Sequence, residues 1–183
     1  MTPIVFLDKD GTLVENVPFN VDPARIALCG GAAEGLRALA ARGFRFAVVS
    51  NQSGVARGYF EESDLVAVHQ RLSELLDASG VNLAGFFYCP HHPAGAVARY
   101  ARACACRKPA PGLLLDALRE LGGDSRDCWM VGDILDDVEA GARAGCRTVL
   151  IDNGNETEWQ AGPHRVPDIR AKDLTEAATL MLK

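Results

Sequence analysis

Two aspartates, Asp8 and Asp10, stand two residues apart directly after the apolar run IVFL at residues 4–7. Such a pair can divide the work of phosphoryl transfer, because one carboxylate attacks phosphorus while the other gives and takes a proton. A solvated turn is the plainer interpretation, since Asp and Gly11 are turn formers. A calcium loop is excluded: the glycine falls at loop position 4 instead of 6, and Phe19 stands where the loop needs its glutamate.

Three further apolar runs are also followed by polar side chains. Ser50 closes the run FRFAVVS, and Asn51 and Ser53 come next. The run CWMVG is followed by Asp133, with Asp136 and Asp137 close behind; acids at a helix start are commonly only caps. Lys108 stands between Arg107 and Pro109, after the run LAGFFYC and a loop. A lysine fixed in this way, just before a helix, is expected to have a role in a site.

The apolar runs predict buried strands, because they are continuous rather than alternating, as in a parallel sheet covered on both faces. Helical spacing lies between them, and Gly43 and Gly80 are plausible helix ends. This alternation predicts a doubly wound, Rossmann-like α/β fold with a mostly parallel sheet. The expected strands are 4–8, 44–50, 83–89, 128–133 and 146–152, and the expected helices are 32–43, 61–80, one opening at Pro111, one over 136–145 and a terminal one from residue 174.

Ligands of such sheets bind beyond the carboxyl ends of the strands, so these polar residues should meet there. Carboxylates alone would repel a phosphate, and Mg²⁺ resolves this because it takes oxygen ligands and bridges carboxylate to phosphate. The sequence therefore predicts Mg²⁺-dependent phosphoryl transfer through an aspartyl-phosphate. In this prediction Ser50, Asn51 and Lys108 hold the charge of the transferring group.

A cluster of thiol and imidazole groups lies between residues 89 and 106. Cys89, His91, Cys104 and Cys106 form the pattern C-x-H-x12-C-x-C, with His92 as a competitor for His91. Four mixed ligands of this kind favour tetrahedral Zn²⁺, and a disulfide or buried free thiols are the alternative. Three other cysteines stand alone in or near apolar runs and are expected to be core residues: Cys29, Cys128 and Cys146.

Length and composition set the frame for these sites. The 183 residues carry a formal net charge of −5, which implies no general attraction to nucleic acid or to an anionic membrane. No apolar run approaches the ~20 residues of a membrane span. The N-terminus lacks the pattern of a signal peptide, so a cytoplasmic location with reduced thiols is expected. We expect a single domain over 1–183, acting as a monomer on a small phosphorylated substrate.

Four of these elements, in this order, resemble the haloacid dehalogenase (HAD) superfamily of phosphatases. Asp8, Asp10, Gly11 and Thr12 match its D-x-D-G-T motif, and further matches are Ser50, Lys108 and the G-D-x-x-x-D motif of Gly132, Asp133 and Asp137. The resemblance implies that Asp8 is the nucleophile and Asp10 the acid and base. It implies Mg²⁺ ligands at Asp8, the Asp10 carbonyl and Asp133, with Asp137 supporting from near Lys108. The segment 11–49 has only 39 residues, which predicts a capless member with an open site.

Within that superfamily, the zinc loop at about 89–106 is similar to those of the D-glycero-D-manno-heptose 1,7-bisphosphate 7-phosphatases and the histidinol-phosphate phosphatases. This resemblance selects His91 over His92 and implies a structural zinc. NQSGVARG at 51–58 looks like the heptose group, whereas histidinol phosphatases typically carry Asp in place of Ser53. Arg57 and Arg107 are then expected to hold a second phosphate or sugar hydroxyls, and Ser53 is also expected to bind the substrate. Ile134 and the loop at 14–23 differ from the usual heptose pattern, so other sugar phosphates stay open.

Two functions of another class use similar residues. A receiver-type signalling domain also combines Asp, Mg²⁺, Ser or Thr and Lys on a doubly wound sheet. Its phosphorylated Asp follows the third strand, whereas here the acid pair follows the first and the third run, LAGFFYC, delivers no Asp. A zinc-dependent interaction module would not need Asp8 and Asp10. Both are less compatible with the sequence than a phosphatase.

Overall fold

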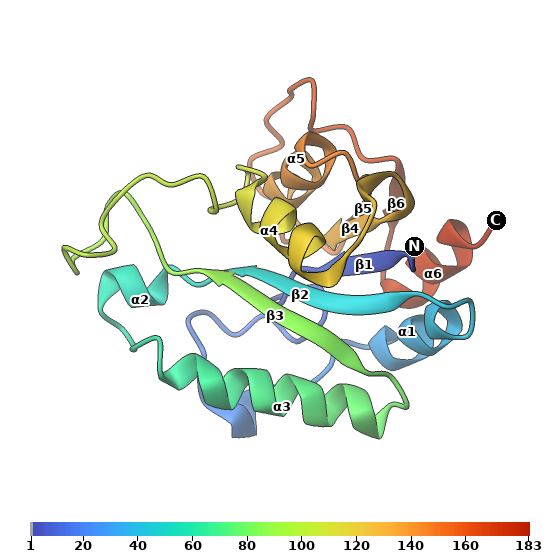
Figure 1. The fold of residues 1–183 in the computed structure, drawn as a ribbon, viewed down its shortest axis with the longest axis horizontal. Coiled ribbons are helices and arrows are strands. Elements are labelled where there is room, and N and C mark those ends of the chain that lie inside the picture. The colour runs from blue at the N-terminus through green and yellow to red at the C-terminus, as the bar shows by residue number, and fades with distance from the viewer. Residues whose placement is uncertain (1) are drawn as a thin grey trace.

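The computed structural model describes residues 2–183 and contains a six-stranded parallel sheet covered by helices on both faces (Figure 1). The spatial order of the strands is β3-β2-β1-β4-β5-β6. The strands are β1 (Ile4–Leu7), β2 (Arg45–Asn51), β3 (Leu83–Cys89), β4 (Trp129–Gly132), β5 (Arg147–Ile151) and β6 (Ile169–Ala171). The predicted doubly wound α/β class is confirmed.

The helices divide into two layers, which explains why the central strand is apolar throughout. The helices are α1 (Ala32–Ala40), α2 (Gly54–Arg57), α3 (Asp64–Ala78), α4 (Gly112–Leu121), α5 (Leu135–Arg143) and α6 (Leu174–Met181), with 3-10 turns η1 (Pro23–Arg25) and η2 (Ser125–Asp127). Helices α1, α3 and α6 cover one face of the sheet, and α4 and α5 cover the other (Figure 1). Val5 and Leu7 of β1 belong to the core on the first face, and Ile4 and Phe6 to the core on the second. All four side chains are fully buried, as expected for a central parallel strand.

The chain reverses its winding between β1 and β4, and this position determines where a ligand can bind. From β1 the chain adds β2 and β3 on one side, and it then returns through α4 to place β4 on the other side of β1. A crevice opens at such a reversal, beyond the carboxyl ends of the two strands. Asp8 and Asp133 are the residues that directly follow β1 and β4.

The sequence placed the five longer strands to within one or two residues but missed the shortest elements. Strand β6 spans three residues and helix α2 spans four, which is too short for a periodic pattern to develop. The helix expected over 61–80 begins at Asp64, and Pro111 precedes α4 as its N-cap instead of opening it. Within residues 2–183, no helix combines the length and hydropathy that crossing a bilayer would require.

Helix α3 offers a direct test of the core. Leu72 is fully buried on its inner face, whereas Val66 on the same helix is 70% exposed. We expect Leu72→Ala to lower the free energy of unfolding by about 2–5 kcal/mol, because it removes buried methyl groups and leaves a cavity. Val66→Ala is the matched control and should change it by less than about 0.5 kcal/mol. Urea denaturation measures both, and equal effects would contradict this packing.

Candidate active site

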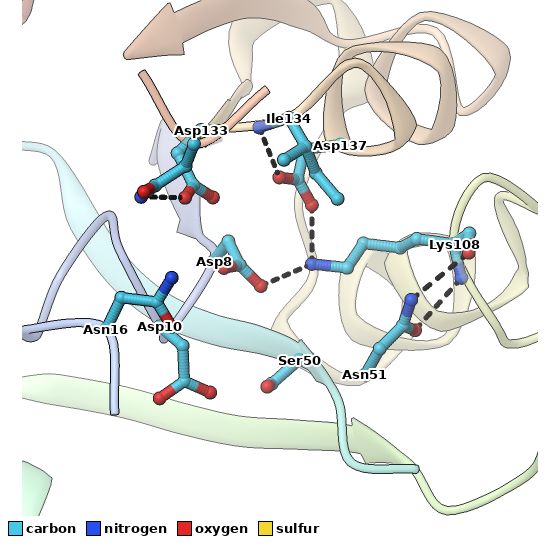
Figure 2. A pocket seen from close by; sticks show the side chains of 10 residues that line it. Asp8, Asp10, Asn16, Ser50, Asn51, Lys108, Asp133, Ile134 and Asp137 are labelled. Carbon is cyan, nitrogen blue, oxygen red and sulfur yellow. Dashed lines mark hydrogen bonds and ion pairs between the residues drawn. The ribbon is translucent and has the colours of Figure 1, made fainter. Parts of the chain in front are cut away.

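The crevice between β1 and β4 holds a polar cavity of about 220 Å³ (Figure 2). The amide of Asp8 donates to the carbonyl of Val131 at 2.9 Å, which extends the pairing of the two strands up to the residue predicted to be the nucleophile. The cavity is lined by Asp8, Asp10, Asn16, Ser50, Asn51, Lys108, Asp133, Ile134, Asp137 and Asn155. The carboxyl ends of the first, second and fourth strands therefore converge as predicted.

Lys108 is the cation at the centre of this cavity. Its side chain is 2% exposed, and its ammonium lies 2.6 Å from Asp8 Oδ1 and 2.7 Å from Asp137 Oδ1. A third contact is a hydrogen bond to the carbonyl of Val49 at 2.8 Å. Figure 2 shows the ammonium between the two carboxylates. The buried lysine therefore makes two hydrogen bonds, to Asp8 and Val49, and an ion pair with Asp137.

Burial and the neighbouring charges have opposite effects on the pKa of Lys108. Burial alone would lower the pKa of Lys108, but the carboxylates of Asp137 and Asp8 outweigh it and raise the pKa above its usual value. Burial raises the pKa of Asp137 to about 7, and the Lys108 charge opposes this rise. Lys108 is therefore protonated at neutral pH, while Asp137 stays close to its titration point.

Asp133 is the second buried acid of the crevice, at 4% exposure. Burial and the nearby charge of Asp8 raise its pKa to about 6. Asn155 donates to its Oδ2 at 2.7 Å and Thr12 to its Oδ1 at 3.4 Å, so both oxygens are oriented. A Cβ on Gly11 would collide with Asp133 and Asn155, and its φ of +83° also favours glycine.

Asp10 lies toward the rim of the cavity and is paired with its neighbour Lys9. The Lys9 ammonium, 1% exposed, lies 2.5 Å from Asp10 Oδ1. Burial raises the pKa of Asp10, and the charge of Lys9 opposes that rise. A raised pKa suits a carboxyl group that has to carry a proton during a reaction. Lys9 was not singled out in the sequence, where one lysine between two acids looked like part of a turn.

Ser50 and Asn51, at the end of β2, both line the cavity. The Ser50 hydroxyl accepts from Gln52 Nε2 at 2.8 Å, which leaves its own proton available to an anion. The Asn51 amide forms two hydrogen bonds of 3.1 Å with the backbone N–H and C=O of Lys108. In this arrangement Asn51 fixes the backbone that carries the lysine.

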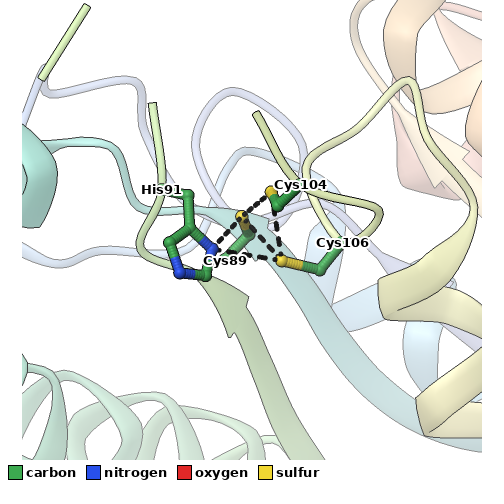
Figure 3. A group of neighbouring side chains, drawn as sticks. All are labelled: Cys89, His91, Cys104 and Cys106. Carbon is green, nitrogen blue, oxygen red and sulfur yellow. Dashed lines mark hydrogen bonds between the residues drawn. The ribbon is translucent and has the colours of Figure 1, made fainter. Parts of the chain in front are cut away.

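The predicted zinc ligands gather into one cluster (Figure 3). The three Sγ atoms of Cys89, Cys104 and Cys106 lie 3.0–3.5 Å apart, and His91 Nδ1 lies 3.7 Å from Cys89 and 3.5 Å from Cys106. Tetrahedral zinc, with Zn–S distances of ~2.3 Å, places its sulfur ligands about 3.7 Å apart. The observed sulfur separations are slightly shorter than this value. A hydrogen bond between two of the thiols lowers the pKa of Cys106 to about 5 and raises that of Cys89.

The cluster connects the end of β3 with the residues that enter the active site. Cys89 is the last residue of β3, and Cys106 lies two residues before Lys108. The long loop between β3 and α4 extends away from the sheet and then returns to it (Figure 1). Cys89 lies at its start, and Cys104 and Cys106 lie near its end. A further backbone bond joins Gly112 to Ala105 at 2.9 Å, at the start of α4. The cluster therefore fixes the path by which the chain delivers Lys108.

The three residues expected to bind substrate lie outside the central cavity. Ser53 lines an adjoining cavity that shares Asp10, Asn16 and Asn51 with the first. The Arg57 guanidinium lies 3.4 Å from His92 Nε2. Burial, and then the charges of Arg107 and Arg57, lower the pKa of His92. Among residues 2–183 no carboxylate pairs with either arginine, and each has one buried nitrogen without a partner.

The segment after β5 also contributes to the site, although none of its residues belongs to a predicted motif. Asn153 donates to the carbonyl of Gly11 at 2.7 Å, Asn155 to Asp133, and Glu156 accepts from the N–H of Leu135 at 2.6 Å. This short segment is thus hydrogen-bonded to the first motif, to the fourth motif and to the start of α5. The signal was present, because this segment also follows the carboxyl end of a strand. Asn16 lies in a loop and gave no signal.

This arrangement can perform nucleophilic phosphoryl transfer. Four carboxylates, those of Asp8, Asp10, Asp133 and Asp137, face only two ammonium groups, a formal excess of two negative charges. The Asp8, Asp133 and Asp137 carboxylates offer oxygens that all lie within 4.8 Å of one another. Such a set of oxygen ligands fits a small divalent cation.

A HAD-hydrolase-like family profile matches residues 105–177, which contain Lys108 and the motif of Asp133 and Asp137. The D-glycero-beta-D-manno-heptose-1,7-bisphosphate 7-phosphatase of Yersinia pestis is 39% identical over 153 residues, or 83% of this chain and 81% of its own. This chain belongs to the HAD-like hydrolases. The enzyme of the same name from Pasteurella multocida is 40% identical over 155 residues, covering 84% of each chain.

Solved structures of HAD-like hydrolases share the fold. The D,D-heptose 1,7-bisphosphate phosphatase of B. bronchiseptica, crystallised with magnesium and phosphate, superposes with a TM-score of 0.83 at 32% identity and covers 98% of each chain. The resemblance to HAD phosphatases is therefore confirmed, and the chain is a phosphatase. Its motif residues Asp8, Asp10, Ser50, Lys108, Asp133 and Asp137 all line one cavity.

The raised pKa of Asp137 predicts how the free energy of unfolding should depend on pH. A carboxyl group whose pKa is raised by folding binds its proton more tightly in the folded state, so its contribution to stability is lost as pH rises. In Mg²⁺-free buffer, Asp133 and Asp137 should lower the free energy of unfolding between about pH 4 and their pKa values of about 6 and 7. Each group contributes at most about 1.4 kcal/mol per pH unit.

Asp137→Asn should therefore reduce this slope between pH 5 and 7, as measured by urea denaturation at a series of pH values. Asp116→Asn is the control, because Asp116 is an exposed acid on α4, paired only with Arg119. It should leave the slope unchanged. A slope that is the same in Asp137→Asn and in the unmodified protein would contradict the raised pKa.

Proposed function

We propose that this HAD-like phosphatase removes the 7-phosphate of D-glycero-D-manno-heptose 1,7-bisphosphate through an aspartyl-phosphate on Asp8, with Mg²⁺ as its catalytic metal. The observation that carries the proposal is the position of the Asp8 carboxylate. It follows the central strand, faces the cavity and lies 2.6 Å from the only lysine ammonium among the lining residues. A nucleophile needs this combination of access and nearby positive charge when it attacks a phosphate.

In the first half of the reaction, a carboxylate oxygen of Asp8 attacks phosphorus. The bond from phosphorus to the leaving oxygen breaks, and the carboxyl group of Asp10 gives its proton to that oxygen. In the second half, a water molecule attacks the same phosphorus and loses a proton to the Asp10 carboxylate. The bond from Asp8 to phosphorus breaks, phosphate leaves, and both residues return to their starting states.

The other side chains hold charge and geometry. Lys108 and the Ser50 hydroxyl stabilise the charge on the phosphoryl oxygens as it moves. Asp137 does not touch substrate in this scheme: its oxygen at 2.7 Å keeps the Lys108 ammonium in place. Asn51 fixes the lysine backbone through its two hydrogen bonds.

The residues present fit a magnesium ion. Both oxygens of Asp137 are engaged, Oδ1 by the Lys108 ammonium and Oδ2 by the N–H of Ile134. The oxygens proposed to bind the ion are therefore those of Asp8 and Asp133, with the Asp10 carbonyl as the third protein ligand. When bound, Mg²⁺ supplies neutralisation of the carboxylates and polarisation of the phosphoryl group. The formal excess of two negative charges in the cavity matches one divalent cation.

The choice of substrate rests on two supports. The relatives from Y. pestis and P. multocida carry the heptose bisphosphatase name and align over most of the chain. Outside the cavity, Arg57 and Arg107 have no carboxylate partner among residues 2–183. The positive charges of both arginines lower the pKa of His92. Two unpaired guanidinium groups suit a second phosphate, and a bisphosphate supplies one.

The cysteine and histidine cluster is proposed to hold a structural zinc ion. All four positions are filled by protein atoms, so no site is left for water or substrate. A reducing cytoplasm would keep the thiols available as ligands. We further propose that residues 1–183 form one domain that acts as a monomer.

The role of Asp8 is tested by Asp8→Asn, which removes the nucleophilic oxygen but keeps the size of the side chain. We expect phosphate release from the heptose bisphosphate to fall by at least about 10³-fold, because the covalent step is lost. Asp116→Asn, the exposed acid used above, should retain full activity. Chelation should abolish turnover and Mg²⁺ should restore it. Near-normal turnover by Asp8→Asn would exclude the mechanism.

A parallel screen tests the substrate. The two anomers of the heptose bisphosphate are compared with histidinol phosphate and with sugar monophosphates, by phosphate release. The proposal expects the highest kcat/KM for one heptose bisphosphate anomer. A higher value for histidinol phosphate or for a sugar monophosphate would replace the substrate and leave the mechanism intact.

Zinc is tested by elemental analysis of freshly purified, unchelated protein. We expect about one zinc ion per chain, since one four-ligand cluster is present. Cys104→Ser and Cys106→Ser should lose it, with disordering of the loop at 89–106. Cys29→Ser is the control, because Cys29 lies outside the cluster and should keep the zinc content unchanged. Protein without zinc would contradict the proposal.

A further inference from the structure

A second cavity, of about 160 Å³, adjoins the catalytic one on the side of Asp10. Asp10, Asn16 and Asn51 line both. Asp10 is the residue that must protonate the leaving oxygen in the proposed mechanism. Whatever is attached to that oxygen therefore starts beside Asp10, and the adjoining cavity is the space that receives it. We refer to it as the leaving-group cavity.

The leaving-group cavity is lined by two chemically different kinds of residue. Asn16, Asn51, Gln52 and Ser53 contribute amide and hydroxyl groups, and Pro18 and Phe19 contribute apolar surface. A sugar has the same division, because its hydroxyls point outward around the ring and its C–H bonds leave apolar faces. Aromatic side chains are suited to such faces through their large apolar surface.

The ring of Phe19 is held in an exposed position. It is 48% exposed and packs edge to face on Tyr59, itself 62% exposed, with ring centroids 4.9 Å apart. The guanidinium of Arg57, one of the two arginines proposed for the second phosphate, lies 5.9 Å from the Phe19 centroid, so the ring is close to that proposed phosphate site. Exposed apolar patches on a protein surface often mark ligand-binding sites.

The backbone of Phe19 is also unusual. Its φ is +54°, a value that bulky residues rarely adopt. Asn20 and Asp22 fix the turn: the Asn20 amide donates to the carbonyl of Asp22 at 3.2 Å, and the Asp22 N–H donates to Asn20 Oδ1 at 3.1 Å. Strained conformations of this kind persist where the surrounding structure enforces them, and they concentrate at binding sites.

We propose that Phe19, supported by Tyr59, forms the wall on which the apolar face of the substrate's sugar packs, and that it determines selectivity for sugar phosphates in the leaving-group cavity. The inference rests on the proposed function, since it takes Asp10 as the acid for the leaving group. It gives this open site an aromatic surface that recognises the sugar directly. Asn16 and Ser53, which line the same cavity, offer polar groups to the sugar hydroxyls.

The test compares two substrates in Phe19→Ala. Alanine keeps a Cβ, and therefore the same backbone requirement, but removes the ring. We expect kcat/KM for the best sugar phosphate of the screen to fall about tenfold, as the loss of one aromatic contact implies. For acetyl phosphate, whose small leaving group does not reach the ring, kcat/KM should stay within about twofold. Tyr59→Ala should give a smaller fall of the same kind.

Trp159→Ala is the matched control. Trp159 is likewise exposed, at 45%, has a positive φ of +40° and lies against an arginine, Arg170, but it lines neither cavity. Trp159→Ala should leave kcat/KM unchanged for both the sugar phosphate and acetyl phosphate. If Phe19→Ala proves unstable in thermal unfolding, Phe19→Tyr and Tyr59→Ala decide: the first should keep sugar-phosphate turnover, and the second should reduce it selectively.

Equal losses with both substrates would assign Phe19 a purely structural role and overturn the proposal, as would no loss with either. The proposed function fails in a different way. If the unmodified enzyme prefers another sugar phosphate, the proposed substrate is wrong. The role of Phe19 is then still tested by whether Phe19→Ala selectively lowers kcat/KM for that preferred sugar phosphate. If Asp10→Asn leaves turnover unchanged, the mechanism fails, whatever Phe19→Ala does.

Discussion

Compensation of buried negative charge is the constraint on which the rest of this structure depends. Phosphoryl transfer to a carboxylate requires acids in a cavity where acids repel one another and their substrate. Lys108 reduces this repulsion because its ammonium lies between Asp8 and Asp137. The same ammonium also donates a hydrogen bond to the Val49 carbonyl. An unpaired charge on Lys108, which is 2% exposed, would be strongly destabilising, so this lysine depends on its two carboxylate partners.

This requirement explains why so much of the chain serves one side chain. Lys108 is carried by a loop, and loops alone position groups poorly. Here the cluster of Cys89, His91, Cys104 and Cys106 joins the end of β3 to the residues just before the lysine, and Asn51 binds the lysine backbone on both sides. On the other side of the crevice, the segment after β5 holds Gly11 and Asp133 in the same manner. The sheet supplies rigid strand ends, and these loop contacts set the final positions.

The sequence was sufficient for the fold class and for the ordered motifs, because both depend on local patterns. Continuous apolar runs such as IVFL reveal buried parallel strands, and Asp8, Lys108 and Asp133 stand at fixed places relative to those runs. Contacts between distant segments left no such pattern. Lys9 looked like a turn residue until its burial was visible, and Asn155 lies 22 positions from Asp133, its hydrogen-bond partner. The left-handed backbone of Phe19 likewise has no sequence signal, since a phenylalanine is not expected there.

The covalent intermediate on Asp8 is the central claim, and it can be observed directly. The enzyme is mixed with the heptose bisphosphate and Mg²⁺, quenched in acid during turnover, and treated with borohydride, which reduces an acyl phosphate to the alcohol. Peptide mass spectrometry then locates the modified residue. The account predicts reduction at Asp8 and not at Asp10 or Asp133. Continued phosphate release with no modification at Asp8, or with modification at another aspartate, would contradict it.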